Sequence, residues 1–185
     1  MLIHKGTQTI ETPRLILRPF EVADAGAMFR NWASDPEVTQ FLTWPTHTGP
    51  QISEMVLRSW VESYSQDNYY AWAIVLKESG EPIGSISGMD PQDSIACVEI
   101  GYCIGKSWWH QGIMTEALRG VMDYLFSIGF NRIFARHDPN NPHSGAVMIK
   151  CGMVYEGTFR QASRNNRGIC DICQYAILKS DWDAR

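Results

Sequence analysis

Residues 107–126 read SWWHQGIMTEALRGVMDYLF, and this stretch constrains the fold more than any other part of the chain. From Leu118 onward, apolar residues recur at spacings of three and four, which predicts a helix that begins near Thr115. The first backbone N–H groups of a helix have no partner within it, and the helix dipole adds about half a positive charge there. Gly112 would let those amides approach a ligand with no side chain in the way. The turn is therefore a candidate phosphate seat, with relief of a tight turn as the alternative reading of the glycine.

The composition is that of a globular protein, with 44% hydrophobic and 19% charged residues. We expect a single domain over residues 1–185, because a chain of this length buries roughly 70% of the surface that its unfolded form exposes. A net charge of −4 argues against binding to a nucleic-acid backbone. The mildly acidic surface suits a cationic partner, although solubility alone explains the same charge.

The first residues, MLIHKGTQTIE, lack the apolar core of a signal peptide, and the apolar run at 69–76 is too short to span a bilayer. We therefore expect a cytoplasmic protein with no membrane partner. Among the five cysteines, Cys170 and Cys173 form a CxxC. They fall in a predicted strand, where positions three apart point to opposite faces, so reduced thiols are favoured over a metal or redox pair. No metal site is predicted.

Alternation and helical spacing predict the order of the elements. Strands are expected at 14–20, 69–76, 82–89, 95–104, 132–138, 154–160 and 169–178, and helices at 24–33, 50–64, from about 115, and at 143–152. Strands and helices mixed in this way, without strict βαβ alternation, indicate an α+β domain.

Two stretches, VEIGYCIGKSWWHQGIMTEAL and FARHDPNNPHSGAVMIKCGMVYEGTFR, resemble the GNAT superfamily of N-acetyltransferases. The branch that contains the ribosomal-protein N-terminal acetyltransferases is the most similar. The resemblance covers nearly the whole chain, since RLILRPF, DPEV and GICDICQYAILKSDW also fit it. It implies a mixed, mostly antiparallel sheet with a splayed parallel strand pair, flanked by helices. It also implies N-acetyltransferase activity with acetyl-CoA as co-substrate.

The family's coenzyme signature is Arg or Gln, two variable residues, Gly, one variable residue, and Gly or Ala. In the corresponding window, 109–114, only the central glycine fits this form. Backbone roles are therefore expected more than side-chain roles. By resemblance, the amides that hold the acetyl-CoA pyrophosphate belong to Gln111, Gly112, Ile113, Met114 and Thr115.

The strand before this turn is expected to bind the pantetheine arm as a neighbouring strand would, through Ile100, Tyr102 and Ile104. The next strand should diverge from it and open a V for the thioester. The family's Asn-x-x-Ser element matches Asn141 and Ser144. By resemblance, Asn141 contacts the cofactor arm and Ser144 sits near the sulfur.

Two residues are candidates for catalysis. Glu99, in the cofactor strand, is the candidate base and would act through water; as alternatives, it faces outward or pairs with a nearby cation. Ser144 is the candidate proton donor to sulfur, and its alternative role is a helix N-cap. Many family members carry a proton-donating tyrosine at the position of Met148, and that tyrosine is absent here.

The acceptor is expected to be a primary amine, either a protein N-terminus or a small molecule. An acidic cleft would suit polycations, and a groove lined with backbone partners would suit a peptide. Asp171, Tyr175 and the loop 44–49 either shape the acceptor pocket or serve packing. A non-catalytic acyl-CoA-binding module is the second class of function that the sequence allows. A homodimer is left open, since dimers are common among small enzymes.

Overall fold

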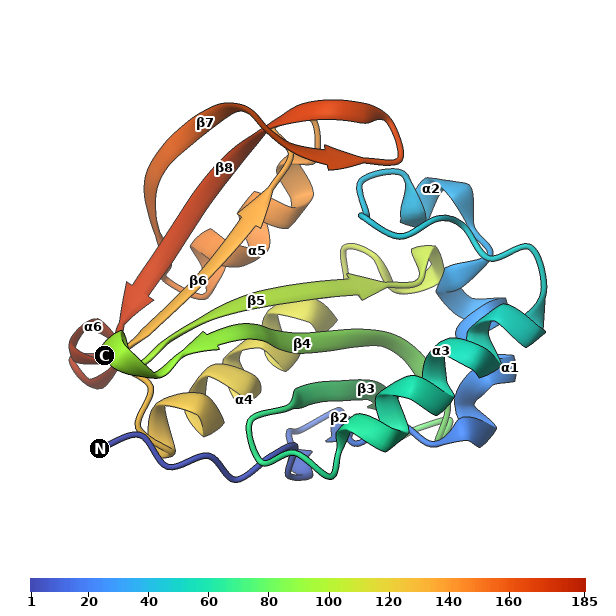
Figure 1. Ribbon diagram of the computed structural model, residues 1–185, viewed down its shortest axis with the longest axis horizontal. Helices are drawn as coiled ribbons and strands as arrows, with labels where there is room; N and C mark the ends of the chain where they lie inside the picture. Colours follow the sequence, from blue (N-terminus) through green and yellow to red (C-terminus); the bar gives the residue numbers. More distant parts are fainter.

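The computed structural model describes residues 1–185, whose strands form one eight-stranded sheet in the order β1-β2-β3-β4-β5-β6-β8-β7 (Figure 1). The strands are β1 (Ile10–Glu11), β2 (Leu15–Arg18), β3 (Tyr70–Leu76), β4 (Pro82–Gln92), β5 (Cys97–Ile104), β6 (Arg132–His137), β7 (Val154–Asn165) and β8 (Gly168–Leu178). The α-helices are α1 (Ala25–Met28), α2 (Pro36–Thr39), α3 (Pro50–Ser63), α4 (Ile113–Ser127), α5 (Pro142–Lys150) and α6 (Lys179–Asp183). The predicted α+β class is confirmed.

Every neighbouring pair in the sheet is antiparallel except β5 and β6. The parallel pair stays in register only from Cys97↔Arg132 to Ile100↔Ala135. Beyond that point β5 continues along β4 as far as Ile104, while β6 continues along β8. Figure 1 shows the two strands separating toward their carboxyl ends. The splayed parallel pair expected from the resemblance is confirmed.

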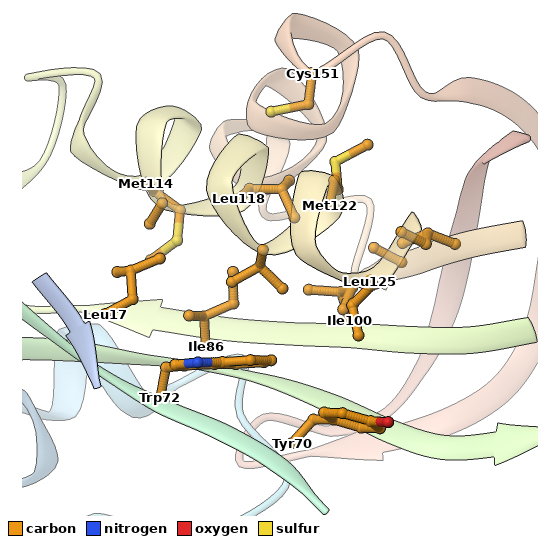
Figure 2. Packing of buried hydrophobic residues seen from close by; sticks show 14 of the residues in the cluster. Leu17, Tyr70, Trp72, Ile86, Ile100, Met114, Leu118, Met122, Leu125 and Cys151 are labelled. Atoms are coloured by element: carbon orange, nitrogen blue, oxygen red, sulfur yellow. The ribbon is translucent and has the colours of Figure 1, made fainter. Parts of the chain in front are cut away.

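Helices on the two faces of the sheet enclose two hydrophobic clusters. The larger cluster holds 25 buried residues and joins α4 to the strands beneath it; Figure 2 shows Leu118 and Leu125 facing Ile86 and Ile100. The smaller cluster packs the segment from α1 to α3 on the opposite face, against Ala73 and Val75. Because β5 alternates, Ile100 points toward α4, and Glu99 belongs to the face that α1–α3 cover.

Several boundaries differ from the sequence prediction for physical reasons. Helix α4 begins at Ile113, two residues early, because Ile113 and Met114 already bury their side chains in the core. Strand β5 begins at Cys97, since residues 93–95 form a 3₁₀ turn. The expected helix at 24–33 is divided into a 3₁₀ turn, α1 and a π-helical segment at Phe29–Ala33. No helix combines the length and the apolar character needed to cross a membrane.

Candidate active site

The turn before α4 leaves its amides open, as the sequence predicts. Gly112 is the N-cap of α4 in a left-handed conformation (φ 72°), and no side chain caps the helix. The first helical hydrogen bond is donated by Glu116 N to Gly112 O. A Cβ at Gly112 would meet nothing closer than an Arg14 nitrogen at 3.8 Å, so the space above the turn is open. The amides of residues 113–115 thus fit an anionic group.

Arg14, the residue directly before β2, fixes this turn from the side. Its Nη1 donates to the carbonyl of Gln111 (3.0 Å), and its Nε donates to the Glu116 carboxylate (2.6 Å). The same carboxylate accepts from Thr12 Oγ1 and from Arg14 N. Burial alone would raise the pKa of Glu116, but these hydrogen bonds outweigh it and lower that pKa. The sequence prediction missed this anchor, because about 100 residues separate Arg14 from its partners.

The turns ahead of α4 and α5 lie against one another. His110, which has a positive φ of 60°, and His143, in the first turn of α5, bring their ring centroids to 4.8 Å. Trp109 packs the first turn against the sheet, and its indole nitrogen donates to Ile104 O at 2.9 Å. Two helix N-termini therefore meet at the mouth of the splayed strands, where their dipoles favour negative charge.

Strand β5 offers a free edge between these termini. Ile100 is the last residue in register with β6, so only residues 101–104 have an edge facing the opening. The side chains of Tyr102 and Ile104 pack against the larger core cluster. An extended arm could pair with this edge in the manner of an added strand.

The start of α5 decides whether Ser144 caps the helix. The N-cap of α5 is Asn141, so Ser144 is not the cap, and that alternative is wrong. Ser144 Oγ instead donates to the Tyr102 hydroxyl (3.2 Å), and this hydroxyl donates to Ser144 O (2.9 Å). Burial raises the pKa of Tyr102, so its hydroxyl stays protonated. Met148 is buried in the core and supplies no proton.

Glu99 is buried and paired with a cation. Both of its carboxylate oxygens accept from Arg136, at 2.8 and 2.6 Å. The Glu99 side chain is 10% exposed and that of Arg136 is 41% exposed, so the pair opens to solvent on the arginine side. Hydrogen bonding to Glu99 raises the pKa of Arg136. The ion pair of Glu99 with a nearby cation, one of the alternatives from the sequence, is therefore present. A proton would reach Glu99 from solvent on the side of Arg136.

Two residues considered for the acceptor pocket have structural contacts. Asp171 accepts from the amide of Gln161 at 2.9 Å within the β7–β8 hairpin. Tyr175 packs between Tyr155 and His137, with ring centroids at 5.4 and 5.6 Å. These contacts hold both side chains in place, and their part in an acceptor pocket stays a prediction.

The cysteines of the CxxC have different neighbours along β8. Cys170 Sγ accepts from Asn165, whereas Cys173 Sγ lies 3.2 Å from Thr158 Oγ1. All five cysteines are free, and no cluster of three or more His, Cys, Asp or Glu side chains could hold a metal ion. The expectation that the two thiols diverge is confirmed.

An open sheet that splays at its single parallel pair, with a bare helix N-terminus at the mouth, is the arrangement that the resemblance to the GNAT N-acetyltransferases implies. The chain belongs to the GNAT acetyltransferase family, since residues 14–154 match the model of the acetyltransferase (GNAT) domain.

Curated relatives and solved structures agree with this assignment. The uncharacterized N-acetyltransferase p20 of Bacillus licheniformis is 29% identical over 95% of this chain and 98% of that protein. The ribosomal-protein-serine acetyltransferase of Escherichia coli is 31% identical over 75% of this chain and 78% of that protein. The microcin C7 self-immunity acetyltransferase MccE, solved with acetyl-CoA and AMP, covers 90% of this chain and 93% of its own with a TM-score of 0.81. At 18% identity, that last similarity shows the fold alone.

Proposed function

We propose that this protein moves an acetyl group from acetyl-CoA to a primary amine by direct attack of the amine on the thioester. The observation that supports this most is the open N-terminus of α4 beside the free edge of β5. The amides of residues 111–115 would hold the diphosphate, with Arg14 keeping their turn in place. The β5 edge near Tyr102 and Ile104, together with Asn141, would hold the pantetheine arm.

Bound acetyl-CoA would supply an activated acetyl thioester, and the chain would supply proton transfer and orientation. Glu99 would accept the amine proton through a water at the exposed side of its ion pair. Ser144 would turn its single hydroxyl proton from the Tyr102 oxygen to the departing sulfur, and Tyr102 is the positioning residue that holds the serine hydroxyl until then. A thiolate with a pKa near ~8.5 needs no strong acid, so a hydroxyl is sufficient here.

An α-amino group is the acceptor that this chemistry favours. With pKa values of about 7.8 for an α-amine and about 10.4 for lysine, deprotonation at pH 7 costs about 1.1 and 4.6 kcal/mol. The α-amine is thus easier to use by about 3.5 kcal/mol. Similarity to a ribosomal-protein-serine acetyltransferase supports the same choice, since that protein's name states a protein acceptor.

Release of CoA tests the proposed function. The protein is incubated with acetyl-CoA and a panel of amines that includes peptides with different first residues, and free thiol is followed. Turnover with at least one α-amine is the expected result. Calorimetry with acetyl-CoA runs in parallel. Binding without turnover across the whole panel would identify the non-catalytic acyl-CoA-binding module instead.

Tyr102→Phe and Ser144→Ala are expected to lower kcat by about 2–10-fold each, the worth of one net hydrogen bond. Because the two hydroxyls act as a unit, the double variant should lose little more than Ser144→Ala alone. The affinity for acetyl-CoA should be unchanged in the two single variants and in the double variant. Steady-state kinetics and calorimetry check this, and fully additive losses would show that Tyr102 does not position Ser144.

A further inference from the structure

The β7–β8 turn and Thr43, after α2, line an open pocket that the proposed chemistry does not use. It has a volume of about 510 Å³ and is lined by Thr43, Arg164, Asn165, Asn166, Arg167 and Gly168. None of these residues is hydrophobic or acidic, and two are arginines. A chain with a net charge of −4 therefore has a locally cationic pocket at this place.

Two asparagines hold the walls of this pocket. The Asn166 side chain donates to Thr39 O and to Trp44 O, both at 2.8 Å. Asn165 is buried; it donates to Asp138 at 2.8 Å and accepts from the amide of Arg167 at 2.9 Å. These contacts fix the turn against the α2 side of the molecule, and Figure 1 shows the hairpin end close to α2.

The two arginines of the pocket have side-chain donors that are free to bind a ligand. Neither Arg164 nor Arg167 takes part in any of the ten ion pairs of the chain. The Arg167 guanidinium lies 5.4 Å from the centre of the Phe41 ring, which orients it. Asp138, the carboxylate behind Asn165, is buried and already accepts hydrogen bonds from Asn140 and Asn165. Two guanidinium groups facing a polar hollow are suited to a carboxylate or a phosphate.

The pocket lies within reach of the acetyl-transfer site. Phe134 is opposite Glu99 in the parallel register, and β6 ends three residues later at His137, next to the Asp138 that holds the turn. At ~3.3 Å per residue, Asp138 is about 13 Å along the sheet from the level of Glu99, and the turn that it holds lies beyond it. One acceptor could therefore place its amine near Glu99 and a second group in the pocket.

We propose that the acceptor carries an anionic group, a carboxylate or a phosphate, at least ~13 Å from its amine, and that Arg164 and Arg167 bind this group. This inference rests on the proposed acetyl transfer and narrows its acceptor class. It disfavours polyamines, because a second ammonium group would meet two positive charges at this pocket. It also gives the polar RNNRG turn a role other than closing a hairpin.

Matched peptides test the inference. Ser-Ala-Ala-Ala-Glu amide, its glutamine counterpart, and a version ending in phosphoserine place the variable residue about 13 Å from the α-amine. The acidic peptides are expected to exceed the glutamine peptide in kcat/KM by about tenfold, with the gain reduced at high salt. Comparing the phosphoserine peptide with the glutamate peptide shows whether the pocket prefers a phosphate or a carboxylate. Equal use of acidic and neutral peptides by the unmodified protein would overturn the inference.

Variants assign the effect to the pocket. Arg164→Gln is the variant less able to disturb the fold, because the Arg164 side chain makes no hydrogen bond or ion pair. Arg167→Gln is the second variant. Both should abolish the preference for acidic peptides and keep turnover of the glutamine peptide. Arg160→Gln is the matched control, since Arg160 is an exposed arginine of β7 outside the pocket and should retain the preference. A preference that survives the double variant would overturn the assignment to these arginines.

Binding measurements distinguish a failure of the proposed acetyl transfer from a failure of the proposed anion site. If acetyl-CoA binds but no peptide is acetylated, acetyl transfer to α-amines is rejected, and calorimetry with the acidic peptide then tests the pocket alone. Heat of binding that Arg164→Gln removes supports the anion site. Absence of heat with unmodified protein overturns it.

Discussion

Replacing Glu99 with glutamine is expected to lower kcat by ~10²–10⁴-fold, which is the usual contribution of a positioned base, while acetyl-CoA affinity is retained. The carboxylate belongs to the β5 face opposite the core, and it is 10% exposed beside an arginine that reaches solvent. Glutamine keeps the shape of the side chain and cannot accept the amine proton. Steady-state kinetics across pH, together with calorimetry for acetyl-CoA, checks the prediction.

The matched control is Arg136→Gln, because Glu99 also has a structural partner. If the carboxylate serves only to hold Arg136, the two variants should lose activity equally, since each breaks the same pair of hydrogen bonds. If Glu99 is the base, Arg136→Gln should keep most of the turnover.

Two results would remove Glu99 from the mechanism. One is a Glu99→Gln enzyme with normal turnover at every pH. The other is a loss of turnover in Arg136→Gln as large as the loss in Glu99→Gln. Either would leave a water or the solvent as the proton acceptor, which an α-amine with a pKa near ~7.8 tolerates better than lysine does.

Local patterns predicted the elements because their causes are local. The spacing of Leu118, Val121, Met122 and Leu125 decides which face of α4 is buried, and these residues line the core as expected. Gly112 takes a positive φ that suits glycine, and the helix starts directly after it. The Asn-x-x-Ser element opens α5 where the resemblance puts it.

The contacts that shape the site could not be predicted in this way, because distant segments make them. Glu99 and Arg136 are 37 residues apart, and Tyr102 and Ser144 are 42 apart. Only the splay of β5 and β6 and the placing of α5 bring these pairs together. No spacing rule links the turn at Asn166 to Trp44, 122 residues away.

The β7–β8 hairpin shows the same limit on a smaller scale. The sequence predicts strands at 154–160 and 169–178, whereas β7 runs on to Asn165. Register shifts at Tyr155/Gly157 and Phe159/Ser163 interrupt the alternation that a longer strand would have displayed. Such irregularities bend a strand, and here they carry the hairpin turn to the α2 side of the molecule.

Leu118→Ala is expected to destabilise the protein by about 3–5 kcal/mol, the range for a large aliphatic side chain removed from a core that cannot close around the cavity. Leu118 is fully buried in α4 and faces the sheet (Figure 2). Urea unfolding, read from the midpoint and the slope, measures the loss. Met55→Ala on α3 is the control: Met55 is 65% exposed, so its truncation should change stability little.

The same variant separates stability from function. Because the backbone amides at the start of α4 lie more than one helical turn before Leu118, folded Leu118→Ala should still bind acetyl-CoA. Ligand that binds only the folded state stabilises it by mass action, so saturating acetyl-CoA should raise the melting temperature of the variant and the parent protein alike. A Leu118→Ala protein that unfolds at the parent midpoint would mean that α4 is not packed on the sheet as described. Without that packing, the amides around Gly112 would have no fixed position relative to the edge of β5.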